Sequence, residues 1–311
     1  MAKWHAKALV QKTISFLPNP EKVNYLFQKY VTKGVELNAD HFGYKINHAA
    51  DHARFYEKYS GQPLAGKQVL ELGTGWYPIV PIALFLKGAE RIVSLDIQSW
   101  MTQASQITAI ETIVDFRRKG ELDKILPEII KERWQVLEVI LQQRDTISKE
   151  EINQQIHLEP MIQDASQTNF ADHTFDFICS NNTFEHVHRS VLFAILKEFK
   201  RIVKADGLMS HFIDLSDHFA HFDTSINVYN FLQFSTKTWQ RIDNDIQPQN
   251  RLRWRDYEEM YATLVIPYVE SDIRKGDMAK LRTVSLAKEF KEHYTEEEVA
   301  ISHGYMISKM S

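Results

Sequence analysis

Val69-Leu-Glu-Leu-Gly-Thr-Gly-Trp-Tyr-Pro78 is a short apolar stretch that runs into a turn with two glycines. The pattern predicts a strand over Gln68 to Leu72 before the turn and a helix over Ile79 to Leu86 after it. Strand, glycine turn and helix in this order begin a βαβ unit, whose turn holds a ligand against backbone amides. Glu71 stands two residues before Gly73, and a carboxylate there repels a pyrophosphate but attracts a cation. We therefore expect a cofactor with positive groups and no phosphates.

Short apolar runs alternate with helical segments from Lys67 onward, which is typical of an α/β fold around a mostly parallel sheet. Further strands are predicted at 91–96, 157–162, 175–180 and 208–213. A further helix is predicted to be capped by Ser190 and to be ended by Gly207. Val299 to Met310 is predicted to be a final strand, antiparallel and at the edge of the sheet.

Two regions depart from this alternation. About 60 residues separate Asp96 from the next predicted strand, far more than the 2–6 residues of an ordinary connection. Their composition predicts a helical hairpin inserted over about 100–156, near the cofactor edge of the sheet. The segment 1–66 is predicted to form an N-terminal helical cap, with helical spacing at Val23, Leu26, Phe27 and Tyr30 and a loop around 41–44. The cofactor-binding domain then covers 67–311.

The composition is that of an ordinary water-soluble protein. The 311 residues are 44% hydrophobic and 25% charged, and 37 basic against 41 acidic side chains give a net charge of −4. This balance argues against nucleic acid or an anionic membrane as partner. No apolar run approaches the roughly 20 residues of a membrane span, so we expect a cytoplasmic protein. The single cysteine, Cys179, excludes an intramolecular disulfide.

Glu71-Leu-Gly-Thr-Gly75 resembles motif I of the class I S-adenosylmethionine-dependent methyltransferases, with motifs of the type 11 kind. The later motifs agree in order over residues 67–214, with the insertion as a departure: Asp96 after the second strand, Asp164-Ala165 after the third, Phe170 to Ile178, and Ser180-Asn-Asn-Thr-Phe-Glu-His-Val187. Phe212 to Phe219 and Asn250 to Tyr257 resemble a bacterial subgroup of undefined substrate.

The resemblance implies a Rossmann-like, seven-strand sheet and S-adenosyl-L-methionine as cofactor. It also implies a cofactor site, whose residues are Glu71, Gly73, Thr74, Gly75, Asp96, Ile97, Asp164, Ala165 and Asn181. The expected reaction is O- or N-methylation of a small-molecule acceptor, such as a metabolite, a sugar or lipid-linked intermediate, or a natural product. Trp76-Tyr77-Pro78 departs from the small residues of many members, which puts the tightness of the loop in question.

Histidines follow the fourth and fifth predicted strands, at the edge where ligands bind in open α/β sheets. An unperturbed imidazole has a pKa suited to a general base near pH 7, and we take His186, His211 and His218 as candidates. The histidines of the segment 211–221, which are His211, His218 and His221, could bind a metal together with Asp214. No ligand spacing such as His-Glu-x-x-His is present, so the sequence alone predicts no metal.

Two other classes of function stay open. One is a non-catalytic protein that keeps the cofactor fold without turnover. The other is a nicotinamide-dependent oxidoreductase, which Glu71 and Pro78 disfavour because its fingerprint needs a glycine where Pro78 stands. Arg251, Arg253 and Arg255 could read a phosphate or carboxylate on a substrate, although an ion-paired surface is the more common role. A homodimer is an open alternative to a monomer.

Overall fold

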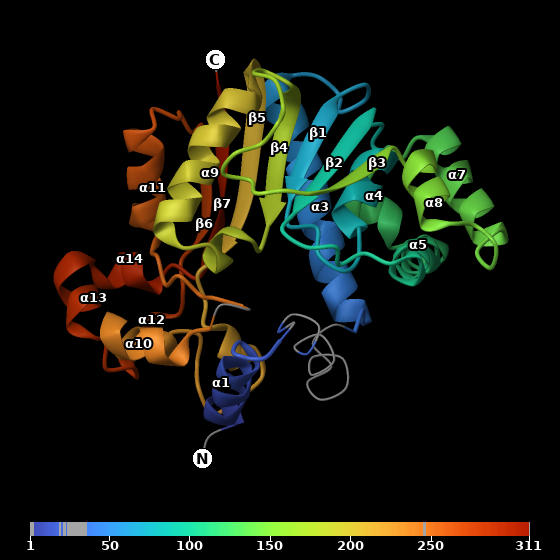
Figure 1. The fold of residues 1–311 in the computed structure, drawn as a ribbon. Helices are drawn as coiled ribbons and strands as arrows, with labels where there is room; N and C mark the ends of the chain where they lie inside the picture. Colours follow the sequence, from blue (N-terminus) through green and yellow to red (C-terminus); the bar gives the residue numbers. More distant parts are fainter. Residues whose placement is uncertain (1–2, 19, 21–22, 24–35, 245–246, 311) are drawn as a thin grey trace.

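The computed structural model describes residues 3–18, 20, 23, 36–244 and 247–310 (Figure 1). Its centre is a seven-stranded sheet in the order β3-β2-β1-β4-β5-β7-β6, in which β7 is antiparallel to both neighbours and the other pairs are parallel. The strands are β1 Gln68–Leu72, β2 Arg91–Asp96, β3 Leu158–Ile162, β4 Phe175–Asn181, β5 Val203–Asp214, β6 Glu270–Arg274 and β7 His303–Lys309. This confirms the predicted α/β, seven-strand Rossmann-like fold.

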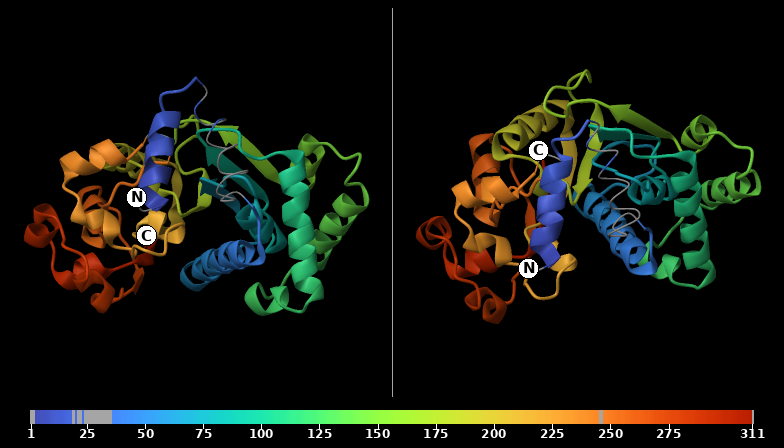
Figure 2. Two further views of the ribbon diagram at one scale, coloured as in Figure 1. Left: turned by 90° about the horizontal axis from the view of Figure 1, so that it is seen from below. Right: turned by 60° about the horizontal axis from the view of Figure 1, so that its bottom comes forward.

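Helices cover both faces of this sheet (Figures 1 and 2). Helices α3 (Ala39–Ser60), α4 (Ile79–Leu86) and α5 (Gln103–Arg118) pack on one face, and α9 (Arg189–Ile202) and α11 (Trp254–Thr263) pack on the other. Successive side chains of a strand point to opposite faces, and in β1 Val69 joins the first core while Leu70 joins the second. Glu71 therefore lies on the same face as Val69, toward α3.

Strand order reverses between β1 and β4, because the chain builds outward from β1 to β3 and then returns to add β4 on the other side. Ligands of open α/β sheets bind outside the carboxyl ends of the strands at this switch point. The loops after β1, β2, β4 and β5 meet there. The fold thus selects the place of the site before any side chain is considered.

The insertion after β2 contains four helices rather than a two-helix hairpin: α5, α6 (Leu122–Ile125), α7 (Lys131–Gln142) and α8 (Lys149–Gln155). They lie at one side of the sheet, beside β2 and β3 (Figure 1). Two of them begin with a capping box, at Thr102 for α5 and at Ser148 for α8. The first of them, α5, also buries apolar side chains against the sheet.

The N-terminal segment contributes α1 (Lys3–Ile14) and α3 to the described part of the chain. The loop predicted around 41–44 is wrong, because α3 begins at Ala39 after the N-cap Asn38, whose side chain accepts a hydrogen bond from the amide of His41. The helical spacing predicted for Leu26, Phe27 and Tyr30 falls outside the described residues. Helix α3 packs on the sheet itself.

The C-terminal half departs from the sequence prediction at three points. Strand β7 lies between β5 and β6 and is not at the edge of the sheet. It begins at His303 rather than at Val299, which belongs to α14 (Glu296–Ala300). The edge strand β6, Glu-Ser-Asp-Ile-Arg, was not predicted because four of its five residues are polar. Helix α9 runs from Arg189 to Ile202, and its N-cap is His188 rather than the predicted Ser190.

Gly207 therefore lies within β5 and does not end the helix. A Cβ atom at this position would approach the carbonyl oxygen of Asp176 in β4 to 3.1 Å and the Val203 side chain to 2.7 Å. Glycine at this position is explained by a close approach of two strands rather than by a helix end.

A third, smaller core joins α1 to the segments after β5 and β6. These are η3 (His218–His221), η4 (Asn230–Gln233), α10 (Thr236–Ile242), α12 (Met278–Arg282), α13 (Lys288–His293) and α14. Figures 1 and 2 show α1 beside α10, where Lys12 Nζ donates to the carbonyl of Asp243 at 2.6 Å. In the described part of the chain, no helix combines the length and the apolar character that crossing a bilayer requires.

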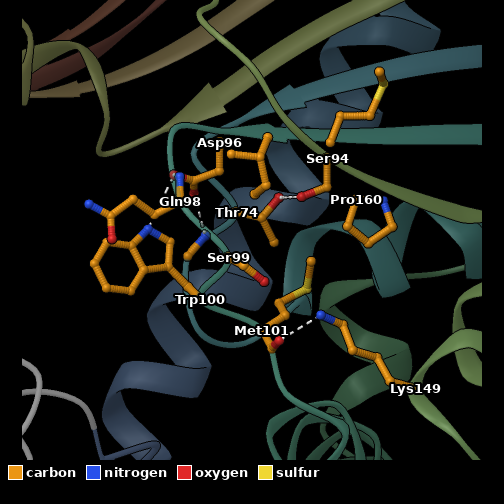
Figure 3. Close-up of a pocket in the computed structure, with 12 residues that line it drawn as sticks. Thr74, Ser94, Asp96, Gln98, Ser99, Trp100, Met101, Lys149 and Pro160 are labelled. Carbon is orange, nitrogen blue, oxygen red and sulfur yellow. Dashed lines mark hydrogen bonds between the residues drawn. The ribbon is translucent and has the colours of Figure 1, made fainter. Parts of the chain in front are cut away.

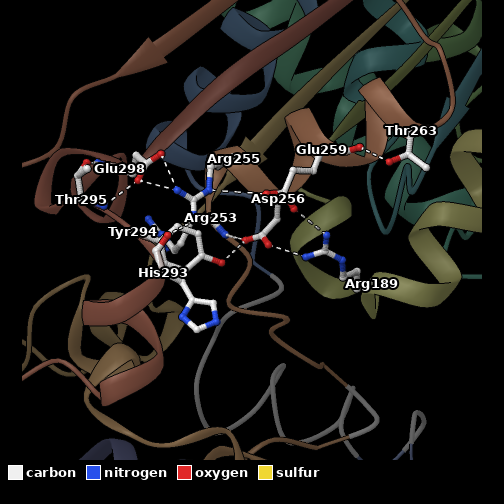
Figure 4. Close-up of polar contacts among 10 residues, drawn as sticks. All are labelled: Arg189, Arg253, Arg255, Asp256, Glu259, Thr263, His293, Tyr294, Thr295 and Glu298. Atoms are coloured by element: carbon white, nitrogen blue, oxygen red, sulfur yellow. Dashed lines mark hydrogen bonds and ion pairs between the residues drawn. The ribbon is translucent and has the colours of Figure 1, made fainter.

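Of the three arginines at 251–255, Arg251 and Arg253 are buried and hold these C-terminal segments together, whereas Arg255 is part-exposed and ion-paired. Figure 4 shows Arg253 and Arg255. Arg253 is completely buried, and its guanidinium donates to the carbonyls of Leu215, Val299 and Ile301. Arg251 donates to the carbonyls of Phe231 and Phe234. These bonds, with one from Arg251 to the hydroxyl of Thr236, occupy the terminal nitrogens of both guanidinium groups, which a substrate phosphate would need.

We predict that Arg253→Met lowers the free energy of unfolding by about 3 kcal/mol or more, because three buried carbonyls lose a charged donor while the apolar stem is kept. Arg255→Met is the matched control, since Arg255 is part-exposed and pairs with Glu298 at 3.3 Å; the expected loss there is about 1 kcal/mol or less. Urea unfolding followed by fluorescence measures both. Equal losses in the two variants would contradict the structural role given to Arg253.

Candidate functional site

The glycine loop after β1 has a backbone conformation that residues with a side chain rarely adopt. Gly73 and Gly75 have φ values of 81° and 73°, in the left-handed region. A Cβ atom at Gly73 would also overlap the side chain of Thr183, which follows β4. The hydroxyl of Thr183 in turn donates to the carbonyl of Leu72 at 3.1 Å. The loops after β1 and β4 are therefore in direct contact at the switch point.

Glu71 presents a buried carboxylate to this loop. The Thr74 hydroxyl donates to it in a short hydrogen bond, and the Ser94 hydroxyl donates to Thr74 at 2.6 Å. Burial raises the pKa of Glu71 to about 7, against the opposing effects of the Thr74 hydrogen bond and the ammonium of Lys45 on α3. A second positive group brought to this carboxylate would favour its ionised form.

Asp96 closes β2 next to the loop. Its carboxylate accepts hydrogen bonds from the amide of Ile97 at 2.8 Å, from the indole of Trp100 at 3.2 Å and from the amide of Gly75 at 3.4 Å. Burial raises its pKa, although these hydrogen bonds oppose the shift. The arrangement fixes one acid at the end of each of two neighbouring strands.

A small pocket lies beside these acids (Figure 3). Thr74, Ser94, Asp96 and Trp100 line one part of it, and the insertion contributes Lys149, whose ammonium donates to the carbonyl of Met101 at 2.8 Å. Trp76 and Trp100 pack their rings 4.6 Å apart at its rim. Trp76 of the departing Trp-Tyr-Pro segment thus lies against the loop after β2, whereas Tyr77 packs on the first core.

The remaining predicted cofactor residues lie along the same edge. Ile97 follows Asp96 and is 74% exposed, which is unusual for an isoleucine. Asp164 follows β3 and is exposed. The side chain of Ser166 and its amide, which donates to Asp164 at 2.8 Å, lower the pKa of this carboxyl. Ala165 is buried in the second core.

Asn181 ends β4 on the same face of the sheet as Glu71, since it stands two residues after Cys179, which is paired with Glu71 and lies in the first core. It is 8% exposed, and neither its amide nitrogen nor its amide oxygen has a hydrogen-bonding partner among the described residues. Buried amides without partners are rare in native proteins. Asn181 therefore offers a donor and an acceptor to a ligand.

The turn after β4 forms the other side of the site. The 3-10 turn η2 (Phe184–His186) follows Asn182, which has a φ of 52° and donates to the hydroxyl of Tyr44 on α3 at 3.2 Å. Asn250 holds this turn from behind, because its amide donates to the carbonyls of Phe184 and Val187, each at 2.8 Å. Hydrogen bonds to the backbone carbonyls of the turn hold it in place. The side chains of the turn are therefore not needed to fix it.

The three predicted catalytic histidines lie in different surroundings. His186 donates from Nδ1 to the carbonyl of Pro248 at 2.7 Å, and its ring lies 4.8 Å from that of His218. Burial lowers the pKa of His186, and it lowers the pKa of His218 to about 3, so both rings are neutral at pH 7. Together they form one wall after β4 and β5.

His211 does not share this wall. It lies inside β5, is completely buried, shares a hydrogen bond of 2.8 Å with the Ser180 hydroxyl and stacks on Phe184 with ring centroids 4.3 Å apart. Burial lowers its pKa to about 3. Its position makes it part of the core under the turn.

Several residues of the site carry no signal in the local sequence. Lys45 and Tyr44 come from α3, and Asn250 comes from a loop about 65 residues after the turn that it holds. Glu185 is 5% exposed and keeps both carboxylate oxygens without a hydrogen-bonding partner among the described residues. In the sequence, its position next to His186 is what could have identified Glu185 as a site residue.

Residues 128–210 match the family model described as a methyltransferase domain. The match begins near the end of α6 and runs through β3, β4 and α9 into β5, so it includes Asn181 and the turn after β4 but not the glycine loop. Among curated proteins, none matches this sequence.

Several solved structures resemble the chain at low identity. A protein of Pyrococcus horikoshii is 13% identical with a TM-score of 0.46, over 91% of this chain and 97% of that one. The 1,6-didemethyltoxoflavin-N1-methyltransferase of Burkholderia thailandensis, solved with 1,6-didemethyltoxoflavin and S-adenosylhomocysteine, is 11% identical with a TM-score of 0.45, over 94% and 91%. The geranyl diphosphate C-methyltransferase of Streptomyces coelicolor is 11% identical with a TM-score of 0.44, over 84% and 79%. Similarity at this level says nothing about an acceptor.

We predict that Gly73→Ala destabilises the protein by about 3 kcal/mol or more, because left-handed strain of roughly 1–2 kcal/mol adds to the overlap with Thr183. Gly75→Ala meets open space and should cost the strain alone. Thermal unfolding compares the two. The double variant Gly73→Ala/Thr183→Ala should recover part of the loss, and no recovery would show that the two loops are not in contact.

Proposed function

We propose that this chain, a class I S-adenosylmethionine-dependent methyltransferase, transfers the methyl group of S-adenosylmethionine to a small-molecule acceptor at oxygen or nitrogen. The observation that carries the proposal is the buried Glu71 carboxylate beside the left-handed glycines. The methionyl end of the cofactor brings an ammonium and a sulfonium, which suit a carboxylate better than a pyrophosphate does.

Each predicted cofactor residue can be given a role in this proposal. Glu71, with Thr74, attracts the methionyl ammonium while the glycine backbone allows close approach. Asp96 receives the ribose hydroxyls, in place of the hydrogen bond that it now accepts from the amide of Gly75. The exposed side chain of Ile97 covers one face of the adenine, with Asp164 and Ala165 at its edge. Asn181 supplies the unpaired amide next to the methionyl group.

Methyl transfer from a sulfonium is an in-line displacement. A lone pair on the acceptor oxygen or nitrogen forms a bond to the methyl carbon while the carbon–sulfur bond breaks, and its electron pair remains on sulfur as the neutral thioether of S-adenosylhomocysteine. The acceptor gives up a proton to a nearby base or to water. The chain chiefly supplies proximity and alignment.

His186 and His218 are proposed to act on the acceptor, because their neutral rings lie together after β4 and β5. His211 is left out of this role, because it is completely buried beneath Phe184. The pocket that His218 lines is small and combines polar groups such as Glu185, Asp214 and Gln249 with the apolar side chains of Leu215, Phe231 and Leu252. This favours a small molecule, and the net charge of −4 disfavours nucleic acid. We also propose a cytoplasmic location and leave a homodimer open.

We predict that the chain binds S-adenosylmethionine and S-adenosylhomocysteine, and that Glu71→Gln and Asp96→Asn each weaken binding about 10- to 100-fold. Each substitution removes one charge-assisted contact of about 1.4–3 kcal/mol. Isothermal titration calorimetry measures the affinities, with Glu292→Gln, an exposed residue of α13, as a control that should bind normally. A folded wild-type protein that gives no heat with either ligand would overturn the proposal.

Turnover separates the enzyme from a non-catalytic protein of the same fold. Purified protein incubated with S-adenosylmethionine and a pool of small metabolites should form S-adenosylhomocysteine, and Asp96→Asn should reduce the rate. Cofactor binding without any pool-dependent product would favour the non-catalytic alternative. A cofactor-dependent change in nicotinamide absorbance would favour the oxidoreductase.

We predict that cofactor affinity rises with pH up to about 7. Burial raises the pKa of Glu71 to about 7 in the free protein, whereas the cofactor ammonium favours its ionised form, so binding below pH 7 must release a proton. Between pH 5 and 7 the affinity should increase by up to about 10-fold per pH unit. Calorimetry in buffers of different ionisation enthalpy counts the proton. Glu71→Gln should abolish the release, and a release that persists in this variant would assign it to another group.

A further inference from the structure

We propose that Glu185, His186 and His218 form a binding site for one divalent transition-metal ion on the acceptor side of the site. Each of the three residues offers one ligand atom, and these atoms all lie within 4.8 Å of one another. Neighbouring ligands of one ion at bond lengths near 2.1 Å lie roughly 3–4 Å apart, so side-chain shifts of about 1 Å would complete the set.

The Glu185 carboxylate is the strongest indication of a missing partner. It is 5% exposed, and neither oxygen has a hydrogen-bonding partner among the described residues. Burying a carboxylate without a partner is costly, and proteins normally pair such a group or use it to coordinate a metal. The carbonyl of Glu185 is engaged, since it accepts the amide of Asn250 at 2.9 Å, which fixes the turn that carries the carboxylate.

His186 is already oriented as a metal ligand. Its Nδ1–H donates to the carbonyl of Pro248 at 2.7 Å, which fixes the tautomer and leaves the lone pair of Nε2 free. A metal-binding imidazole typically donates its other N–H to a backbone carbonyl or a carboxylate in this way.

His218 lies near a carboxylate, although no hydrogen bond joins the two groups. Its Nε2 lies 3.6 Å from the carboxylate of Asp214, which follows β5 and also accepts the amide of Ser216. Asp214 can thus orient His218 or supply a fourth ligand. The ligands come from the loops after two adjacent parallel strands, β4 and β5. For this reason the three residues do not form a metal-binding motif of fixed spacing in the sequence.

Two histidines with one carboxylate favour a first-row transition ion such as Zn²⁺, Fe²⁺, Co²⁺ or Ni²⁺, whereas Mg²⁺ and Ca²⁺ prefer oxygen ligands. Three protein ligands leave coordination positions open. Since the turn that carries Glu185 and His186 directly follows Asn181 and Thr183, an acceptor bound at an open position would lie near the proposed cofactor site. The inference rests on the proposed function for this last step: the ion would hold an oxygen-bearing acceptor and favour loss of its proton to water.

The test is a titration of the purified, metal-free protein with Co²⁺, followed by visible absorption. We expect one ion per chain and an intensified d–d spectrum, which marks four- or five-coordinate Co²⁺ with imidazole ligands. Glu185→Gln, His186→Ala and His218→Ala should each weaken binding more than the roughly 10- to 100-fold typical of a lost outer partner. His188→Gln is the matched control, since His188 is exposed, two residues from His186, and makes no capping bond.

Competition identifies the class of ion, and Zn²⁺ but not Mg²⁺ should displace Co²⁺. Absence of binding, or binding that the three substitutions leave unchanged, would overturn the proposal and leave His186 and His218 as bases. Thermal unfolding of each variant verifies that it is folded. Calorimetry with S-adenosylhomocysteine on the same samples separates the two proposals, because loss of Co²⁺ binding alone rejects the metal site, whereas loss of cofactor binding alone rejects the proposed function.

Discussion

A carboxylate buried at the end of a central strand is the constraint around which this protein is arranged. Glu71 is 2% exposed, and its charge is stable only with nearby partners. Thr74 and Ser94 supply a chain of hydroxyls, and α3 supplies the ammonium of Lys45. Gly73 and Gly75 allow the loop to stay close to this carboxylate. Because Lys45 must reach Glu71, α3 lies on the same face of the sheet. Helix α3 is therefore part of the site, although it lies outside the segment that resembles the methyltransferases.

The central elements are predictable because local chemistry defines their ends. The strands 68–72 and 91–96 and the helix 79–86 are apolar runs bounded by glycine, proline or charge, and the structure has them at the same residues. Other boundaries depend on tertiary contacts. Gly207 looks like a helix end, but β5 already begins at Val203 and needs glycine against β4. Strand β6 has a polar sequence and is defined by its pairing with β7.

The residues of the site likewise fall into those that the local sequence predicts and those that only the tertiary fold brings together. The predicted cofactor residues follow strand ends that the pattern locates, and the structure places them along one edge. Lys45, Glu185 and Asn250 come from three distant segments, and only the fold brings them there. The histidines show why residue type is not enough. His211 and His218 are seven residues apart, yet one lies inside β5 under Phe184 and the other beyond its end.

The antiparallel insertion of β7 between β5 and β6 has a consequence for synthesis. Residues 215–302 separate β5 from β7, so almost 90 residues must be made before the edge of β5 is covered. At about 5–20 residues per second, this interval is on the order of 5–20 s. During it a twelve-residue strand carries unpaired amides and carbonyls along one side. The nascent chain thus passes through a stage in which another strand, from the same polysome or elsewhere, could pair with β5 first.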